Sequence, residues 1–166
     1  TRAFSFPRRP EWLRENPPVA SAEDRFHMVK LAVDNVVGFT ASDVDIVRDG
    51  STYTVDTLSD LREQLGSEAE LFLIVGADSA VSMDRWIRSE EIGDLASIVA
   101  VGRPGQVFNA TSLASSHPAS GAEYVEGPMV DVSATRLRGL LSAGSPIDEF
   151  VPGLVPEYIE KQGLYR

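Results

Sequence analysis

The stretch Leu71-Phe72-Leu73-Ile74-Val75-Gly76 is a continuous apolar run that ends at a glycine. A second run of the same kind, Ile98-Val99-Ala100-Val101-Gly102, lies farther along the chain. Continuous apolar runs bounded by glycine are typical of strands that are buried on both faces of a parallel sheet. We therefore expect both segments to be strands of such a sheet.

Helical patterns lie on both sides of these runs in the sequence. The spacing of Ser21 and Asp24 resembles a capped helix start, and Gly66 and Gly163 are typical helix stops. With the apolar residues that share one face, these signals predict four helices, over residues 21–35, 54–65, 134–143 and 156–162.

The remaining segments complete an alternation of strands with helices. Residues 42–48 alternate between apolar and polar side chains and predict a half-buried strand, and Tyr124-Val125 begins another. Residues 105–121, rich in Ser, Ala and Gly, indicate a flexible loop. The alternation favours an α/β fold with a parallel sheet. No internal repeat or second domain is evident, so we expect one domain over residues 1–166.

The composition excludes several classes of protein. Hydrophobic residues make up 43% of the 166 residues and charged residues 24%, as in globular proteins. A net charge of −10 argues against a general nucleic-acid binder, because phosphate backbones need clustered Lys and Arg. No apolar run approaches the roughly 20 residues that span a bilayer, so no membrane partner is expected. The absence of cysteine excludes disulfides and thiolate metal sites and fits a cytoplasmic location.

Polar residues follow the two apolar runs, at the strand ends where open parallel sheets bind ligands. Gly76 would allow a backbone to approach a ligand closely, and Asp78 either caps the next helix or accepts a hydrogen bond from a ligand hydroxyl. Arg103 follows the second run and either clamps an anion or is merely exposed.

Two further segments carry groups that suit a ring-bearing ligand. Tyr53 and Thr54 open the predicted helix after residue 53, where hydroxyls and free N–H groups either read a carboxylate or amide or simply begin a helix. Trp86 either stacks on a flat ring or belongs to the core.

The stretch Val132-Ser133-Ala134-Thr135-Arg136-Leu137-Arg138 is the strongest indication of a phosphate site. Ser133 can cap the helix that follows, and the N-terminus of a helix attracts anions. Arg136 and Arg138 add donors that match phosphate oxygens. The alternative is a capped surface helix with two solvated arginines.

Four segments in this order, residues 51–58, 74–86, 101–105 and 132–138, closely resemble the bacterial nicotinate-nucleotide adenylyltransferases of the nucleotidyltransferase superfamily. The resemblance runs from about residue 3 to the C-terminus. It implies a Rossmann-like, doubly wound parallel sheet with helices on both faces. It also implies adenylyl transfer from ATP to nicotinate mononucleotide in NAD biosynthesis, with Mg²⁺ on the triphosphate and few dedicated metal ligands in the protein, so no metal site is assigned.

The resemblance implies a role for each candidate residue. Trp86 would stack on the nicotinate ring, and the segment of Tyr53 and Thr54 would read its carboxylate. Gly76 and Asp78 would line the nucleotide crevice, with Arg103 near the substrate. The ATP phosphates would be held by Ser133, Thr135 and Arg138, beside Arg136. The partners would then be these two small molecules, while the oligomeric state stays open, a homo-oligomer included.

One family motif is missing from the sequence as it starts at Thr1, namely Gly-Gly-x-Phe-Asp-Pro-x-His-x-x-His. We expect His27 to pack within its helix or lie on the surface and His117 to be solvated, so no catalytic residue is assigned. Either a segment precedes Thr1, which we favour, or the catalytic motif has been lost. The rival functions are adenylyl transfer to nicotinamide mononucleotide or phosphopantetheine, and non-catalytic nucleotide binding.

Overall fold

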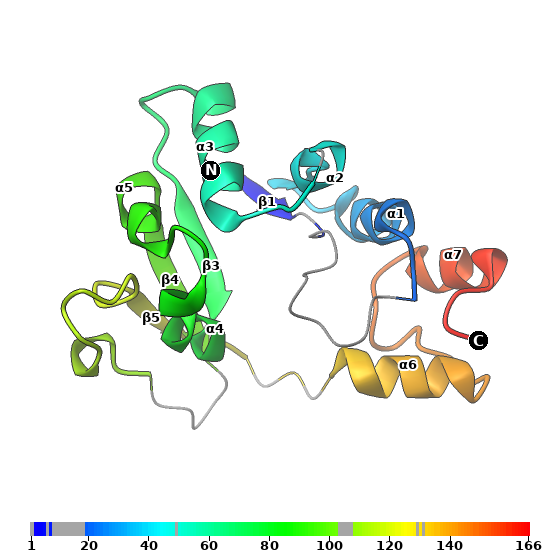
Figure 1. Ribbon diagram of the computed structural model, residues 1–166. Coiled ribbons are helices and arrows are strands. Elements are labelled where there is room, and N and C mark those ends of the chain that lie inside the picture. Colours follow the sequence, from blue (N-terminus) through cyan, green and yellow to red (C-terminus); the bar gives the residue numbers. More distant parts are fainter. Residues whose placement is uncertain are drawn as a thin grey trace. The chain divides into compact units, whose positions relative to one another are not determined.

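The computed structural model describes residues 2–5, 7, 19–48, 50–102, 108–128, 130 and 132–166 (Figure 1). The chain forms two compact units, and each is described by itself. Unit 1 combines residues 1–52 with residues 131–166, and unit 2 comprises residues 53–130. No helix among the described residues is long and apolar enough to cross a membrane.

Unit 2 contains a parallel sheet of the order β3-β4-β5. Ile74 of β3 lies opposite Val99 of β4, and Val101 of β4 lies opposite Val125 of β5. The strands are β3 (Phe72–Gly76), β4 (Ser97–Gly102) and β5 (Glu123–Glu126), and the α-helices are α3 (Thr54–Leu65), α4 (Ala77–Val81) and α5 (Ile92–Leu95). Three short 3₁₀ helices complete the unit: η1 (Met83–Arg85), η2 (Ser89–Glu91) and η3 (Ala110–Ser112).

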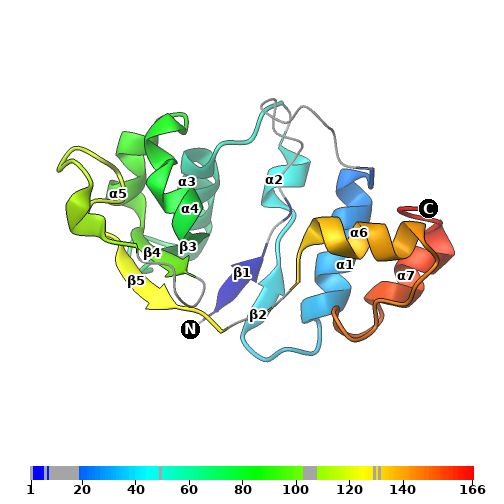
Figure 2. The ribbon, with the colours of Figure 1, turned by 90° about the horizontal axis from the view of Figure 1, so that it is seen from below.

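The core of unit 2 lies between its helices and one face of the sheet. Helices α3, α4 and α5 lie on the same side of the strands (Figure 2). Val55 of α3, Ala80 of α4 and Ile92 of α5 are fully buried and belong to one cluster with Ile98 and Ala100 of β4. The two predicted strands and the helix from Thr54 to Leu65 are thereby confirmed.

The other face of this sheet differs from the prediction. Phe72 and Ile74 of β3 are 58% and 66% exposed, and Val125 of β5 is 42% exposed. Within unit 2, the first apolar run is therefore packed on one face only, whereas we expected burial on both faces. A continuous apolar run indicates that both faces of the strand carry apolar side chains, but it does not identify what packs on each face.

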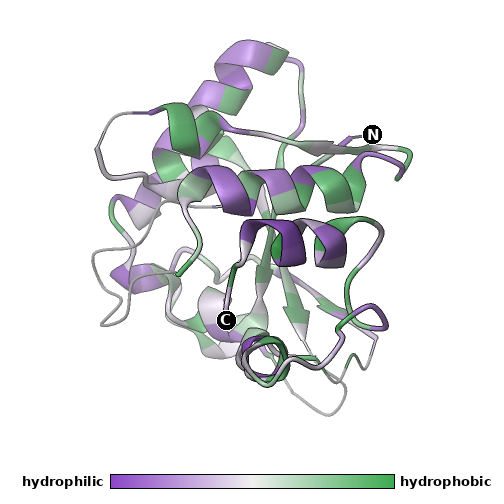
Figure 3. Ribbon diagram, turned by 90° about the vertical axis from the view of Figure 1, so that its right-hand side faces the viewer, coloured by the Kyte–Doolittle hydropathy of each residue, from purple (hydrophilic) through white to green (hydrophobic). Residues whose placement is uncertain are grey.

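Unit 1 contains a second parallel pair, β1 (Ala3–Ser5) with β2 (Phe39–Ala41). Its helices are α1 (Ala22–Val33), α2 (Val44–Val47), α6 (Ala134–Ser142) and α7 (Val155–Gln162). Ile147, Val155 and Ile159 form its buried core, against side chains of α1 and α6. Hydrophilic and hydrophobic bands alternate along α1 and α7 in the view from the α7 side (Figure 3).

The helix ends in both units are where the sequence places them. Ser21 Oγ accepts a hydrogen bond from the Asp24 N–H at 3.0 Å, and Asp24 Oδ2 accepts one from the Ser21 N–H at 3.3 Å, which completes a capping box. Gly66 and Gly163 end α3 and α7 with φ of 88° and 63°, a backbone conformation that glycine adopts without strain.

The predicted strand over residues 42–48 is wrong, because Val44–Val47 form the helix α2 and the strand β2 lies earlier, at Phe39–Ala41. The neighbours Val44 and Asp45 are both buried, at 6% and 1% exposure, whereas a strand would direct them to opposite faces. The helical turn also brings Arg48 to 3.8 Å from the Asp45 carboxylate, at i,i+3 spacing.

The predicted loop over residues 105–121 is a loop with one short 3₁₀ helix in its described part, which begins at Phe108, and it is anchored to the core at two points. Phe108 and Ala119 join the core of unit 2, at 8% and 0% exposure, and η3 lies between them. His117 is also not solvated, since its side chain is only 10% exposed. Its Nδ1 accepts from the Ala119 N–H, so Nε2 carries the proton and donates to the Val81 carbonyl at 3.1 Å.

His27 packs as expected, with its ring stacked on Tyr158 of α7 at 5.2 Å between centroids. The Tyr158 hydroxyl donates to Asp24 Oδ1 at 2.8 Å and so joins α7 to the capped start of α1. The Ser21 hydroxyl, followed by that of Tyr158, holds the pKa of Asp24 below its ordinary value. Burial, followed by the bond to Asp24, raises the pKa of Tyr158.

A methyl group at Gly102 should disturb the edge between β4 and β5. Its Cβ would come within 2.6 Å of Cε2 of the Tyr124 ring, which lies 6.0 Å from the Phe108 ring between centroids. We expect Gly102→Ala to lower the free energy of unfolding by about 1–3 kcal/mol in denaturant titration, as overpacking does. Gly93→Ala in α5 is the control, because nothing lies within 4 Å of its added Cβ. Equal stability of Gly102→Ala and the unchanged chain would contradict this account.

The bonds to Asp24 should make the stability of unit 1 depend on pH. A carboxyl whose pKa is lowered by folding stabilises the fold above its unfolded pKa of about 3.9 and loses that contribution as the pH falls through the folded value. We therefore expect the stability difference between the unchanged chain and Asp24→Asn to be full at neutral pH and to shrink below about pH 4, in denaturant titrations across that range. Glu23→Gln, which removes a charge from the same helical turn, should show a weaker pH dependence.

Candidate functional site

The start of α3 presents the predicted segment of Tyr53 and Thr54. Tyr53 is the N-cap in an extended conformation, and Thr54 is the first helical residue. The Tyr53 carbonyl accepts hydrogen bonds from the N–H groups of Asp56 and Thr57 at 3.1 and 3.2 Å, while its half-buried ring packs against the core of unit 2. The first N–H groups of a helix have no partner within that helix, so this end favours an anion.

The end of β3 presents Gly76 and Asp78. Gly76 is the N-cap of α4, and a Cβ there would lie 2.7 Å from Asp78 Oδ1. The same oxygen accepts a hydrogen bond from the Ser79 N–H at 2.9 Å. The missing side chain of Gly76 therefore makes room for the exposed Asp78 carboxylate. Asp78 lies within the first turn of α4 and is not its N-cap residue.

Trp86 ends η1 and packs on the same core as Tyr53. Its backbone N–H donates to the Met83 carbonyl at 2.9 Å, and its side chain is half-buried against the core cluster that holds Met83 and Val55. Part of the indole therefore packs on the core, and the rest is exposed to solvent. Its stacking on a flat ring stays a prediction.

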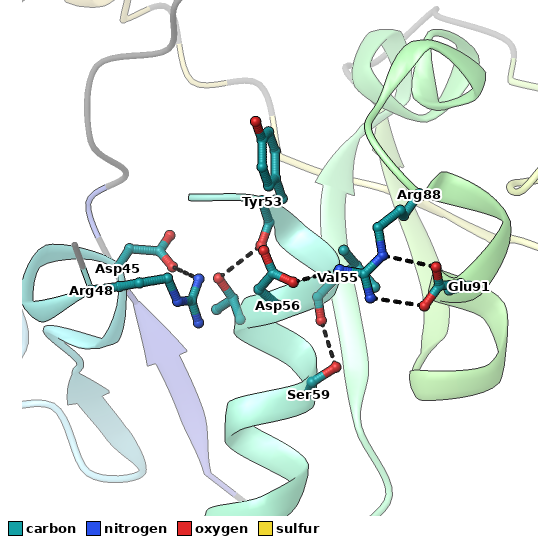
Figure 4. Close-up of polar contacts among 9 residues, drawn as sticks. Asp45, Arg48, Tyr53, Val55, Asp56, Ser59, Arg88 and Glu91 are labelled. Atoms are coloured by element: carbon teal, nitrogen blue, oxygen red, sulfur yellow. Dashed lines mark hydrogen bonds and ion pairs between the residues drawn. The ribbon is translucent and has the colours of Figure 1, made fainter. Parts of the chain in front are cut away.

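Arg88 joins the turn after Trp86 to the start of α3, and sequence analysis missed this contact (Figure 4). Its Nε and Nη2 donate to the two carboxylate oxygens of Glu91 at 2.8 and 2.9 Å, and its Nη1 donates to Asp56 Oδ1 at 2.8 Å. The bonds to Arg88 lower the pKa of Glu91, and those to Glu91 first and Asp56 second raise the pKa of Arg88. The i,i+3 spacing of Arg88 and Glu91 is visible in the sequence, but the bond to Asp56 spans 32 residues.

The start of α6, in unit 1, carries the predicted phosphate-binding side chains. Ser133 caps the helix as expected, with its Oγ accepting from the Arg136 N–H at 3.1 Å. Arg138 Nη2 donates to Thr135 Oγ1 at 3.4 Å, and the Arg136 guanidinium lies 5.2 Å from the centre of the Phe150 ring. The exposed hydroxyls and guanidiniums lie within the first two turns, which makes this end of the helix positive.

The predicted residues fall into two groups by unit. Unit 2 holds Tyr53, Thr54, Gly76, Asp78 and Trp86, and unit 1 holds Ser133, Thr135, Arg136 and Arg138. Arg103 lies outside the described residues.

A cavity of about 310 Å³ in unit 1 contains none of the predicted residues. It lies beside α7, with Ile147 and Ile159 on its wall and the carboxylates of Asp148, Glu157 and Glu160 around it. Arg166 also lines the cavity, so acidic residues outnumber basic ones there by three to one. The phosphate site at the start of α6 stays a prediction.

Comparison with known proteins identifies the class. Residues 5–140 match the cytidylyltransferase-like family. The chain is 40% identical over 155 residues to a probable nicotinate-nucleotide adenylyltransferase of Streptomyces coelicolor, covering 93% of this chain and 80% of that protein. It is 42% identical over 156 residues to a probable nicotinate-nucleotide adenylyltransferase of Saccharopolyspora erythraea, covering 93% and 71%.

A solved structure agrees on the fold. The nicotinic acid mononucleotide adenylyltransferase of Plasmodium falciparum, complexed with NaAD, superposes with a TM-score of 0.64 at 17% identity, covering 92% of this chain and 78% of that one. The chain therefore belongs to the cytidylyltransferase-like family of nucleotidyltransferases, among the nicotinate-nucleotide adenylyltransferases. The predicted family, enzyme class and Rossmann-like α/β fold are confirmed. Enzymes of this kind generally use a divalent metal.

Proposed function

We propose that this chain transfers the adenylyl group of ATP to nicotinate mononucleotide, giving deamido-NAD and pyrophosphate. The observation that carries the proposal is the 37–42% identity, over 93% or more of the chain, to proteins named as probable nicotinate-nucleotide adenylyltransferases. The ATP and mononucleotide would be its small-molecule partners, and we expect the reaction to take place in the cytoplasm.

The start of α6 supports an ATP phosphate site. Its capped N-terminus and the side chains of Thr135 and Arg138 supply N–H, hydroxyl and guanidinium donors within two helical turns. Such donors neutralise phosphate charge without a conformational change in the helix. In a protein of net charge −10, this local concentration of donors is what would attract a polyphosphate.

The start of α3 and Trp86 support a mononucleotide site in unit 2. A helix N-terminus favours a ring carboxylate, and an accessible indole favours a flat ring beside it. Gly76 and Asp78 would line the nucleotide crevice at the end of β3, and Arg103, after β4, would lie near the substrate. All of these except Arg103 are described residues of unit 2.

The chemistry would be an in-line displacement at the α-phosphorus of ATP. A phosphate oxygen of the mononucleotide forms the new P–O bond, and the bond to the bridging oxygen of pyrophosphate breaks. Positioning and charge neutralisation carry most of such a transfer, so no covalent intermediate with the protein is needed. The residues at the start of α6 would hold the triphosphate in line and bind the charge on the departing pyrophosphate.

We propose Mg²⁺ as the divalent metal, carried by the triphosphate. Mg²⁺ keeps several waters and is commonly bound through substrate phosphates and one or two carboxylates, where it offsets phosphate charge. Among the described residues, no group of three or more His, Asp or Glu side chains could hold a metal ion.

Pyrophosphate release tests the proposal. The purified chain is given ATP and Mg²⁺ with nicotinate mononucleotide, nicotinamide mononucleotide or phosphopantetheine, and pyrophosphate is measured. We expect turnover that prefers the acid mononucleotide. Preference for another acceptor would show that the enzyme acts on that acceptor and not on nicotinate mononucleotide. Nucleotide binding without pyrophosphate release from a folded sample would favour a non-catalytic binding module.

Two variants should separate the proposed binding of ATP from that of the mononucleotide. Arg138→Ala should lower kcat/KM for ATP by the equivalent of about 1.5–3 kcal/mol, the scale of a hydrogen bond to a charged group. Trp86→Leu keeps an apolar side chain on the core but removes the flat ring, so it should raise the KM for nicotinate mononucleotide by about 3–10-fold, the scale of aromatic stacking. Steady-state kinetics with each substrate varied in turn measures both, and equal effects of either variant on both substrates would contradict the assignment.

A further inference from the structure

We propose that Arg88 is a positioning residue that makes the site favour an acid over an amide mononucleotide. The inference rests on the proposed function and concerns the start of α3, where the ring substituent would be read. Arg88 would act through Asp56 and through the turn that carries Trp86, without touching the substrate.

The contacts of Arg88 connect the two elements that would hold the mononucleotide. One nitrogen of its guanidinium bonds Asp56, in the first turn of α3, and the other two bond Glu91, in η2 (Figure 4). Trp86 lies two residues before Arg88, and Tyr53 three residues before Asp56. The single side chain of Arg88 therefore ties the turn after Trp86 to the first turn of α3.

The backbone at Arg88 shows that this turn is held in place by its contacts. Arg88 has a φ of 54°, in the left-handed region that non-glycine residues rarely adopt. Its carbonyl accepts a hydrogen bond from the Glu91 N–H at 3.1 Å, alongside the paired side-chain bonds between the same residues. These bonds stabilise a conformation that an arginine would not otherwise favour.

The charge of Asp56 explains why the guanidinium matters for specificity. Asp56 lies in the first turn of α3, three positions after Tyr53 at the N-cap. An unpaired carboxylate there would offset the positive end of the helix dipole and repel a second anion. The bond from Arg88 at 2.8 Å offsets that charge and leaves the helix end available to a ring carboxylate.

The two mononucleotides isolate this effect. They share the ribose and phosphate and differ only in the carboxylate or amide on the ring, so a charge near that substituent changes their ratio. Loss of the guanidinium leaves the carboxylates of Asp56 and Glu91 without their shared partner. We expect the acid to lose more affinity than the amide.

The test compares dissociation constants of the acid and amide mononucleotides by calorimetry without ATP, beside kcat/KM for each. Arg88→Gly removes the guanidinium while its glycine accepts the positive φ, so the backbone stays unstrained. We expect it to reduce the acid-to-amide preference by about 3–5-fold, the upper range for exposed charge pairs, and less at high salt. Arg88→Lys, which keeps the charge, should retain most of the preference.

Two further variants separate charge from structure. Arg88→Gly combined with Asp56→Asn removes the uncompensated carboxylate at the helix start and should restore part of the preference. Arg166→Ala is the matched control, because Arg166 is also an exposed arginine, 3.8 Å from the Glu160 carboxylate in unit 1. It removes the same charge and should leave the preference unchanged.

The outcomes distinguish this inference from the proposed function. If Arg88→Gly weakens both mononucleotides equally, or if Asp56→Asn restores nothing, the role of Arg88 in specificity is overturned while the transferase activity stands. If the unchanged chain binds the acid preferentially, loses that preference in Arg88→Gly and yet releases no pyrophosphate, the inference is supported and the proposed function fails. Binding of neither mononucleotide overturns both.

Discussion

The packing of α3, α4 and α5 on one face of the sheet is the interaction on which unit 2 depends. Val55, Ala80 and Ile92 come from three helices and meet Ala100 of β4 with no exposed surface. This burial fixes where each helix begins relative to the strand ends, because the helices cannot slide along the sheet without opening the core. Tyr53 and Trp86 rest on the same cluster, so the side chains that would bind a ring are positioned by the core itself.

An acidic chain that handles anions must supply positive charge locally. In the proposed function this charge comes from helix starts, where backbone N–H groups and the helix dipole act together. Serine caps one such start at Ser133, and arginines follow it within two turns. At the start of α3 the acidic residue Asp56 would work against the same effect, and its bond with Arg88 offsets that charge. The proposed role of this ion pair therefore rests on the electrostatic potential at the start of α3, because exposed ion pairs contribute little to stability.

Helix ends were predicted correctly where a cap or stop residue marks them. Ser21 with Asp24, Ser133, Gly66 and Gly163 marked helix ends correctly, because caps and left-handed stops depend on neighbours within four residues. The predicted strand over residues 42–48 was wrong because it took each polar residue of the alternation to be exposed. Asp45 is instead buried beside Val44 in a helical turn. The prediction that His117 is solvated was wrong because its partner, the Val81 carbonyl, lies 36 residues away and leaves no local signal in the sequence.

The sequence by itself determined the family, the three strands of unit 2, the four longer helices, and the serine cap and arginines at the start of α6, because motifs and caps depend on neighbouring residues. Only the tertiary structure decided which face of β3 is packed, that residues 108–121 fold onto the core, and that Arg88 bonds Asp56. Each of these depends on residues that are distant in sequence and brought together by the burial of a shared core. The pattern of a single segment carries no record of such partners.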